Sequence, residues 1–461
     1  MSKLKLFKEA IRGSHDRDFT QGPIGTALVL LAVPMVLETL LESLFAVVDI
    51  FFVAHLGADA VATVGLTESV MTLVYSMAMG LGVGATALVA RRIGEKDPEA
   101  AAHTAAQAIM LGILIAVPLG IICAMLAPAI LGMLGASAEV RSSGAMFARI
   151  ELGANVVVVL LFLINAIFRG AGDAAIAMRS LWLASACNMV FGPLLIFGVG
   201  PLPRLGLTGA AVGTTLGRSI GVLYQVSQLR RRDGRIVIKK HHWKLDPPLM
   251  KTVLKLSGSA TFQMLIGSTN WIALIRILSG FGSIVLAGYT IAIRVVIFAL
   301  MPSWGLSNAG ATLVGQNLGA KQPDRAERSI WLAGFYNMLV LGGVGLVFTL
   351  AATPIVHIFT ADPEIVPWGV RALRIISLGF VFYAWGMVLS NAFNGAGDTW
   401  TPTWLNLFIF WLLEIPLAWG LSKVPSVGPN GVFWAVAIAF SVYAVVSAVL
   451  FKRGRWKTRV V

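Results

Sequence analysis

The sequence predicts an all-α protein that crosses a membrane twelve times, arranged as two similar lobes of six helices. Three observations lead to this prediction: the composition, a series of long apolar segments, and an internal repeat. The chain has 461 residues, of which 57% are hydrophobic and only 13% are charged. Because soluble domains carry about 25% charged residues, this composition is typical of a polytopic membrane protein.

The apolar segments follow one another along the whole chain. A transmembrane helix needs about 20 mostly apolar residues, and we find twelve segments of this kind. They cover residues 24–54, 61–90, 102–121, 143–168, 176–198, 207–229, 251–280, 284–314, 329–352, 366–392, 402–422 and 430–451. The stretch around 122–140 is interpreted as an irregular connection.

Basic residues gather on one side of the predicted bundle. This side receives the amino-terminal tail, the connection after the second segment, the central stretch RRRDGRIVIKKHHWK and the carboxy-terminal tail KRGRWKTR. The opposite connections hold little beyond Arg141, Arg204 and Lys423. By the positive-inside rule we expect both termini in the cytoplasm. The net charge of +14 is therefore interpreted as an orientation signal, and no nucleic-acid partner is expected.

The two halves of the chain repeat each other. GLGVGATALVARRIGEKDP, from Gly80, aligns without a gap with GLSNAGATLVGQNLGAKQP, from Gly305, at an offset of 225 residues. FRGAGD and FNGAGD match at the same offset. Because each copy spans six helices, an even number, both halves enter the membrane in the same direction and are related by an axis along its normal. The predicted units are a basic tail (1–23), an amino lobe (24–229), a basic linker (230–250), a carboxy lobe (251–451) and a basic tail (452–461).

The first apolar segment carries three acids, Glu38, Glu42 and Asp49. At about 100° per residue they share one helix face over roughly 16 Å. An acid at mid-membrane costs at least ~2.5–3.5 kcal/mol, so a one-sided row of acids indicates a polar cavity inside the bundle. For Glu38 and Glu42 the alternative is a structural ion pair with another helix. Arginines that could form it include Arg218, Arg276 and Arg294.

Several stretches together carry a family resemblance. They are PMVLE, VVD and VAHLGADAVA in the first segment, GLGVGATALVARRIGEKD after the second, and later NAIFRGAGDA, NMVFGPLLIFG and NAFNGAGDTWTP. In order and spacing they resemble the multidrug and toxic compound extrusion (MATE) family, prokaryotic branch. The resemblance implies a V-shaped bundle in a bacterial or archaeal plasma membrane. It also implies an antiporter, not an enzyme, that exports organic, cationic or amphipathic compounds against H⁺ or Na⁺ by alternating access.

The resemblance also implies a cation-coupling site around Asp49, with Glu42 and Glu38 as neighbouring acids. Family members carry a pattern resembling N-x-x-x-D-P in the fifth span. Here Asn188 is present, but Gly192 stands at the aspartate position. Thr214 matches the threonine of the sixth span. A Na⁺ ion could bind at Asp49, Asn188 and Thr214, yet the missing carboxylate favours H⁺, which a single carboxylate can carry. No other cofactor is expected.

A substrate cavity could be lined by polar, aromatic and methionine side chains of both lobes. The candidates are Gln263, Asn270, Asn391, Glu414, Met77, Trp304 and Tyr383. Sulfur and aromatic faces adapt to ligands of varied shape, although such residues more often pack or face lipid. For Glu414 the alternative is a snorkelling or arginine-paired acid. We expect a small-molecule substrate, a lipid bilayer as surroundings, and a monomer.

Two further interpretations remain open. The runner-up function is a flippase for a lipid-linked oligosaccharide, which would use intramembrane arginines to bind a pyrophosphate. Near the amino terminus, the stretch LKLFKEAIRG places Leu4, Phe7 and Ile11 on one face with lysines around it. It is either a polar tail or a short amphipathic helix on anionic headgroups.

Overall fold

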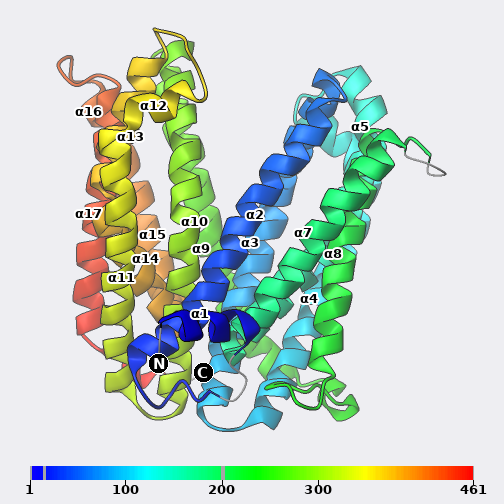
Figure 1. Cartoon of the computed structure of the whole chain (residues 1–461). Coiled ribbons are helices and arrows are strands. Elements are labelled where there is room, and N and C mark those ends of the chain that lie inside the picture. Colours follow the sequence, from blue (N-terminus) through cyan, green and yellow to red (C-terminus); the bar gives the residue numbers. More distant parts are fainter. Residues whose placement is uncertain (1–2, 14–16, 199–202, 460–461) are drawn as a thin grey trace.

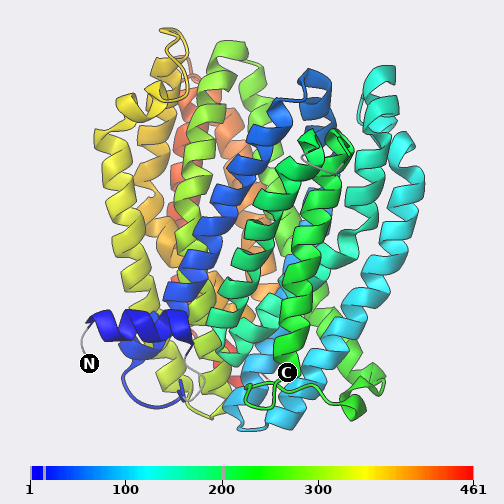
Figure 2. The ribbon, with the colours of Figure 1, turned by 45° about the vertical axis from the view of Figure 1, so that its right-hand side comes forward.

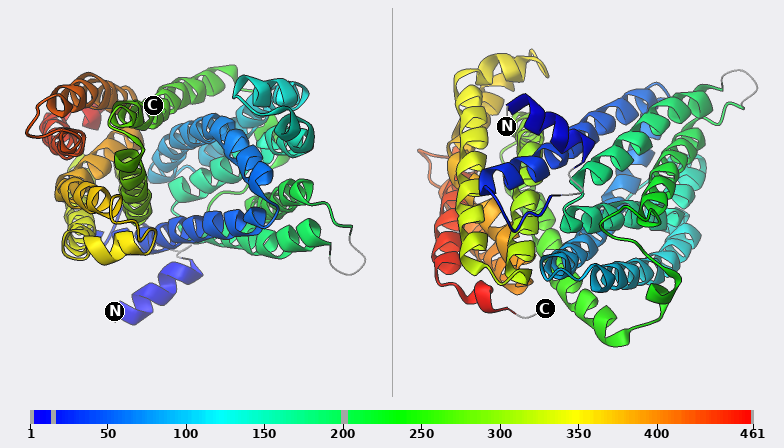
Figure 3. Two further views of the ribbon diagram at one scale, coloured as in Figure 1. Left: turned by 90° about the horizontal axis from the view of Figure 1, so that it is seen from above. Right: turned by 60° about the horizontal axis from the view of Figure 1, so that its bottom comes forward.

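The protein, described from a computed structural model, consists of helices and their connections, with no strand among the residues whose placement is defined. These are residues 3–13, 17–198 and 203–459, without the side chains of residues 3, 45–47, 49 and 50. The helices form two groups that lie close together at the end carrying both termini and farther apart at the opposite end (Figure 1). Views along the bundle from above and from below show the same two groups side by side (Figure 3).

The amino lobe contains seven long helices that follow a short one. They are α1 (Lys3–Arg12), α2 (Ile24–Ala54), α3 (Ala58–Gly94), α4 (Pro98–Met133), α5 (Ala138–Gly153), α6 (Asn155–Ala171), α7 (Ala174–Phe197) and α8 (Leu207–Leu229). The predicted span 143–168 is divided between α5 and α6, which break at Ala154.

One connection in this lobe was predicted wrongly. The stretch 122–140 was expected to be irregular, but α4 continues to Met133 and only residues 134–137 lie between α4 and α5. The helix passes through Pro118 and Pro128. Proline is tolerated inside transmembrane helices because neighbouring groups satisfy the backbone positions that it frees. Apolar residues around both prolines favour continuation of α4 over a loop.

The carboxy lobe repeats this arrangement with more breaks. Its elements are α9 (Pro247–Ser279), α10 (Ser283–Gly319), α11 (Pro323–Leu350), α12 (Ala352–His357), α13 (Val366–Leu378), α14 (Phe380–Gly395), α15 (Trp400–Asn406), the π-helical η2 (Leu407–Glu414), α16 (Ile415–Ser422) and α17 (Asn430–Lys452). Short 3₁₀ turns, η1 (Lys240–Trp243) and η3 (Arg455–Thr458), lie in the linker and the tail. Helices α13 and α14 form one predicted span bent by 54°.

The helices account for the twelve predicted spans. Within the described residues, nine helical segments are long and apolar enough to cross a membrane, or ten when the bent pair α13–α14 counts as one span. The other two spans are α8 and α9, which are richer in polar residues. The chain is therefore an all-α polytopic membrane protein with two six-helix lobes.

The repeated glycine motifs form the contact between the lobes. A Cβ atom at Gly94 of α3 would lie 2.0 Å from the carbonyl oxygen of Gln316 in α10, and one at Gly319 would lie 2.1 Å from that of Arg91. The two contacts are equivalent under the 225-residue offset. A Cβ at Gly80 would likewise meet Thr261 of α9 at 2.0 Å. The repeat thus places glycine where the backbones of the two lobes meet, near the termini.

Changing Gly94 to alanine is expected to destabilise this contact. The new methyl group would overlap a backbone carbonyl, and overpacking of this kind typically costs about 1–3 kcal/mol. The matched control is Gly65→Ala in the same helix, where a Cβ meets no atom within 4 Å. The control should be neutral or slightly stabilising, since alanine suits a helix interior better than glycine. Thermal unfolding of both purified variants checks this, and equal melting temperatures would contradict the role given to Gly94.

A short segment, residues 17–22, crosses the terminal side of both lobes, and we call it the strap. Asp18 forms an ion pair with Lys96 at the α3–α4 connection. Burial acts to raise the pKa of Asp18, but hydrogen bonds from Lys96 and Thr20 outweigh it and lower the pKa below its usual value. On the other side, Arg325 of α11 donates to the carbonyl oxygen of Gln21 at 3.0 Å. The strap therefore joins the amino lobe to the carboxy lobe.

One carboxylate of the amino lobe holds several side chains of the basic linker. Glu99, at the start of α4, accepts hydrogen bonds from Lys239 and, at 2.7 Å, from Nε2 of His242. The backbone N–H of Lys239 donates to Nδ1 of His242 at 3.0 Å. Because Nδ1 accepts a hydrogen bond, the ring proton lies on Nε2, which donates to Glu99. His241 adds a longer contact of 3.3 Å to the same carboxylate. Through these contacts Glu99 anchors the linker to the start of α4.

Candidate functional site

Glu38 lies at the centre of a buried polar network in the amino lobe. Its Oε1 accepts hydrogen bonds from Nη1 of Arg169 at 2.8 Å and from Nδ2 of Asn165 at 3.1 Å, and its side chain is buried. The amide of Asn165 in turn accepts from Ser180 at 2.7 Å and from Gln225 at 2.6 Å. Four helices, α2, α6, α7 and α8, contribute to this network. The guanidinium of Arg169 compensates the charge of the buried acid.

The ion pair of Glu38 is the structural alternative that the sequence left open, but its partner was not among the three arginines considered. Arg169 belongs to the FRGAGD motif at the end of α6. The internal repeat of the sequence contains a signal that identifies Arg169 as the partner of Glu38. At the offset of 225 residues, Glu38 corresponds to Gln263 and Arg169 to Asn394, so both charges are replaced together by neutral amides. The contact between Glu38 and Asn165 also has a counterpart, since Gln263 donates to Ser390 at 3.4 Å.

The carboxy lobe reaches this part of the amino lobe directly. The hydroxyl of Thr312 in α10 donates to the carbonyl oxygen of Arg169 at 3.1 Å. The amide of Gln316, also in α10, donates to the carbonyl oxygen of Gly170 at 3.0 Å. The Glu38–Arg169 pair therefore adjoins the contact between the lobes. A movement of one lobe against the other would change the contacts of Thr312 and Gln316 with the backbone next to this pair.

Glu42 lies one turn further along α2 and has a different environment. No hydrogen bond to its carboxylate is recorded among the described residues, and the charges that act on it are Glu38, Arg169 and Arg218. Arg218 of α8 has its own partners: it donates to the hydroxyl of Tyr75 at 2.8 Å and lies 3.7 Å from Glu151. Glu42 thus lies near two arginines that already have partners.

The predicted coupling residues are partly brought together. Asn188 of α7 and Thr214 of α8 are both buried, and the amide of Asn188 donates to the threonine hydroxyl at 3.2 Å. A Cβ at Gly192 would meet only Oδ1 of Asn188, at 3.3 Å, so packing does not require glycine there. The backbone of Asp49 belongs to α2, but its side chain lies outside those that the structure describes.

Glu414 is a deeply buried acid inside the carboxy lobe. It ends the π-helical segment η2 and is 1% exposed, and neither carboxylate oxygen has a hydrogen-bond partner within the distance limits among the described residues. Asn270 of α9 is the polar group that acts on Glu414, and Glu414 in turn acts on Tyr289 of α10 and Tyr383 of α14. None of the ion pairs recorded for the described residues includes Glu414. π-Helical segments are frequent at functional sites, which makes this acid a candidate for binding a proton or a cation.

The other residues predicted to line a cavity differ from Glu414 in burial and contacts. Tyr383 stacks on Phe440 with ring centroids 4.0 Å apart, which is a packing role. Met77 and Asn391 are half-buried, and Trp304 is exposed.

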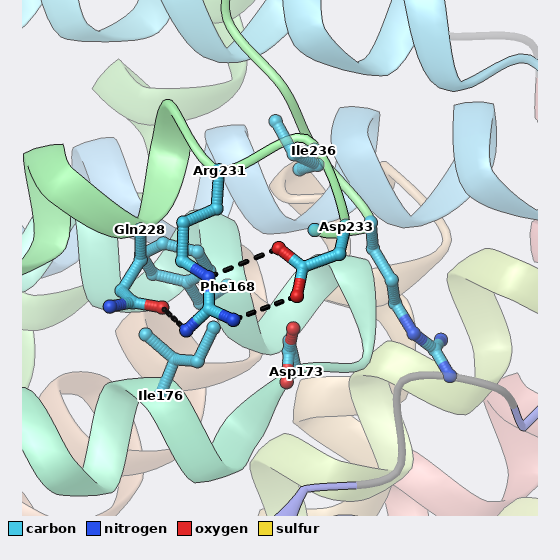
Figure 4. A pocket seen from close by; sticks show the side chains of 9 residues that line it. Phe168, Asp173, Ile176, Gln228, Arg231, Asp233 and Ile236 are labelled. Atoms are coloured by element: carbon cyan, nitrogen blue, oxygen red, sulfur yellow. Dashed lines mark hydrogen bonds and ion pairs between the residues drawn. The ribbon is translucent and has the colours of Figure 1, made fainter.

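Two cavities lie near the termini, away from these residues. The first, of about 20 Å³, is drawn in Figure 4, where Arg231 forms an ion pair with Asp233 at 2.7 Å and a contact with Gln228. It has room for about one water molecule. The second, of about 290 Å³, is bounded by the strap together with Ile93, Lys96 and Gln316. Neither includes a residue predicted to bind substrate.

Comparisons with known proteins agree on one family. The MatE family model matches residues 34–194 and 260–419. The chain is 27% identical to "Probable multidrug resistance protein NorM" of Thermotoga maritima, over 94% of this chain and 93% of that protein. It is 24% identical to "FAD transporter" of Shewanella oneidensis, over 86% and 88%. A solved structure titled "Outward-facing conformation of a multidrug resistance MATE family transporter of the MOP superfamily" superposes with a TM-score of 0.88 at 26% identity, covering 95% and 97%.

Proposed function

This chain belongs to the MatE family of membrane transporters, and we propose that it is a secondary active antiporter that exports organic cationic or amphipathic compounds in exchange for a cation. The observation that carries the proposal is the pair of buried acid sites, Glu38 with Glu42 in one lobe and Glu414 in the other. Acids inside membrane bundles are costly and mark ion and substrate pathways. Relatives named for multidrug resistance support the choice of substrate class.

Alternating access is supported by the way the two lobes meet. Their close contacts lie at the terminal end, through the glycines of the repeat and through the strap. The lobes diverge at the other end (Figure 1). Such an arrangement corresponds to a transporter that is closed on the terminal side. Breaking these contacts and forming others at the diverging end would open the terminal side and close the opposite one, as rigid-body rocking of two repeats does.

The coupling ion in this proposal is H⁺. A dehydrated Na⁺ needs charge compensation from its ligands, and Gly192 removes one carboxylate from the group formed by Asn188 and Thr214. A proton needs only one carboxylate that can gain and lose it. Glu42, which faces Arg169 and Arg218 without a recorded hydrogen bond, lies on the same helix as Asp49 and completes the proton-accepting face.

Transport in proteoliposomes tests this function. In Na⁺-free vesicles a pH gradient should drive the movement of a fluorescent organic cation, and a protonophore should stop it. The matched control is the same vesicle preparation with a Na⁺ gradient and no pH gradient, which should give no active transport. If transport instead requires Na⁺, a metal site must be completed by an acid such as Glu42 or Glu414, and proton coupling is wrong.

The proposed location is a prokaryotic plasma membrane with both termini in the cytoplasm. In a chain lacking Cys123 and Cys187, Arg232→Cys in the exposed linker should react with an impermeant maleimide only from the cytoplasmic side. The matched control is Arg204→Cys, which is exposed at the opposite end, before α8, and should react only from outside. Labelling in the reverse sense would overturn the orientation.

The flippase interpretation is not favoured by the arginines of the amino lobe. Arg169 is paired with Glu38, and Arg218 contacts Glu151 and Tyr75. Arg276 and Arg294, the other two considered, are exposed on the carboxy lobe. A pyrophosphate site would need unpaired guanidinium groups that converge.

A further inference from the structure

The first helix, α1, presents two different exposed surfaces. At about 100° per residue, Leu4, Phe7 and Ile11 lie within one sector of the helix. Leu4 is 65% exposed and Phe7 is 44% exposed. A neighbouring sector, which contains Leu6 and Ala10, packs against the protein. An exposed apolar stripe on a helix that already buries another sector is unusual for a surface in contact with water alone.

The second exposed surface of α1 is basic. Lys5, Lys8 and Arg12 are all exposed and lie in one sector, directly beside the apolar stripe. The single acid of the helix, Glu9, lies beyond them and is paired with Arg17 at 2.7 Å. A helix with adjacent apolar and basic stripes matches the boundary of a membrane, where acyl chains meet anionic headgroups.

The protein holds α1 in one orientation. The guanidinium of Arg179, in the second turn of α7, donates to the carbonyl oxygens of Ile11 and Arg12 at the end of α1. Helix α1 also packs on α2 and α7. Its axis runs nearly perpendicular to the transmembrane helices, at the end of the bundle that carries the termini (Figure 2). Seen along the bundle, it lies outside the outline of the other helices (Figure 3).

We propose that α1 is an interfacial helix that binds anionic phospholipids of the leaflet on the terminal side. Its axis is parallel to the membrane plane and its position is beside the bundle, at the level where α2 and α7 begin. There Leu4, Phe7 and Ile11 would enter the shallow acyl region, while the basic stripe would meet phosphate groups. Glu9 of α1 is paired with Arg17 of the strap, so lipid binding would also fix the segment that joins the two lobes.

The test uses the full-length protein in lipid nanodiscs. In a chain lacking Cys123 and Cys187, a Leu4→Cys substitution carries an environment-sensitive fluorophore. Quenching is compared between phosphatidylglycerol and phosphatidylcholine that carry a nitroxide on the acyl chain, at equal mole fraction. Phosphatidylglycerol, the anionic lipid, should quench the fluorophore roughly three- to fivefold more strongly than phosphatidylcholine. This ratio is on the scale of one basic residue at an anionic surface. This comparison does not depend on transport or on its coupling ion.

Matched variants identify the residues of α1 that are responsible for lipid binding. Lys5→Glu/Lys8→Glu should reduce the ratio of the two quenching values to about one, and Phe7→Ser should lower both values while keeping the ratio. The control, Arg232→Glu/Lys240→Glu, makes the same change of charge in the exposed linker and should leave the ratio unchanged. Three results would each overturn the proposal: no quenching by either lipid, a ratio of one in the unmodified chain, or an equal loss of ratio in the control.

Discussion

Replacing Glu38 with glutamine is expected to lower the free energy of unfolding by about 3–5 kcal/mol, the usual cost of removing one partner of a buried ion pair. The carboxylate accepts hydrogen bonds from Arg169 and Asn165, and the amide would leave the guanidinium without a counter-charge. Unfolding of the purified protein, followed by denaturant or by heat, measures the loss.

Two further variants decide whether the loss comes from the ion pair. Glu38→Gln/Arg169→Gln should recover most of the stability, because removing both charges is often nearly neutral. Glu42→Gln is the matched control on the same helix, and it should change the stability little because no hydrogen bond to Glu42 is recorded among the described residues. A Glu38→Gln protein as stable as the original chain would show that the pair does not hold the amino lobe together.

The architecture was largely predictable because it depends on patterns that are local or repeated. Apolar segments of membrane length predict spans, and the 225-residue repeat predicts two lobes in the same orientation. The contacts of Gly94 with Gln316 and of Gly319 with Arg91 are equivalent under this offset, which confirms the pseudo-symmetry. Each lobe supplies the glycine for one contact and the carbonyl for the other.

The breaks in the helices were less predictable. The bend of 54° between α13 and α14 and the break at Ala154 occur inside continuous apolar sequence. Conversely, α4 runs through two prolines that would end most soluble helices. Hydropathy reports whether a segment prefers lipid, but not where its axis changes direction, since direction is set by the packing of neighbouring helices.

For the candidate site, the sequence identified the acids but not their partners. Glu38, Glu42 and Glu414 stand out because acids are rare in membrane segments. Arg169 was missed because it lies 131 residues from Glu38, within a motif that also resembles a turn. Comparison of the repeats would have revealed it, because Gln263 and Asn394 replace both charges in the second copy. A charged pair present in one copy and neutral in the other indicates a contact.

Asp49→Asn is expected to reduce active efflux to the level of empty vesicles while leaving the protein folded. Glu38 is held by Arg169 and Asn165. We therefore expect the proton to be exchanged by the other two acids that the helical spacing predicts on this face, Glu42 and Asp49. Asparagine has nearly the shape of aspartate but cannot gain and lose a proton at physiological pH. Proton-driven efflux of an organic cation from proteoliposomes, at matched amounts of protein, measures the effect.

The Glu38→Gln/Arg169→Gln protein is the control that separates coupling from structure. If Glu38 acts only through its ion pair, this protein should still transport against a gradient, whereas Asp49→Asn should not. Binding of the organic cation to Asp49→Asn should persist, because the substitution removes proton exchange and leaves the rest of the interior unchanged. Export at the original rate by Asp49→Asn would remove Asp49 from the mechanism. Proton coupling would then depend on Glu42, whose charged neighbours Arg169 and Arg218 come from two other helices, or on Glu414 in the opposite lobe.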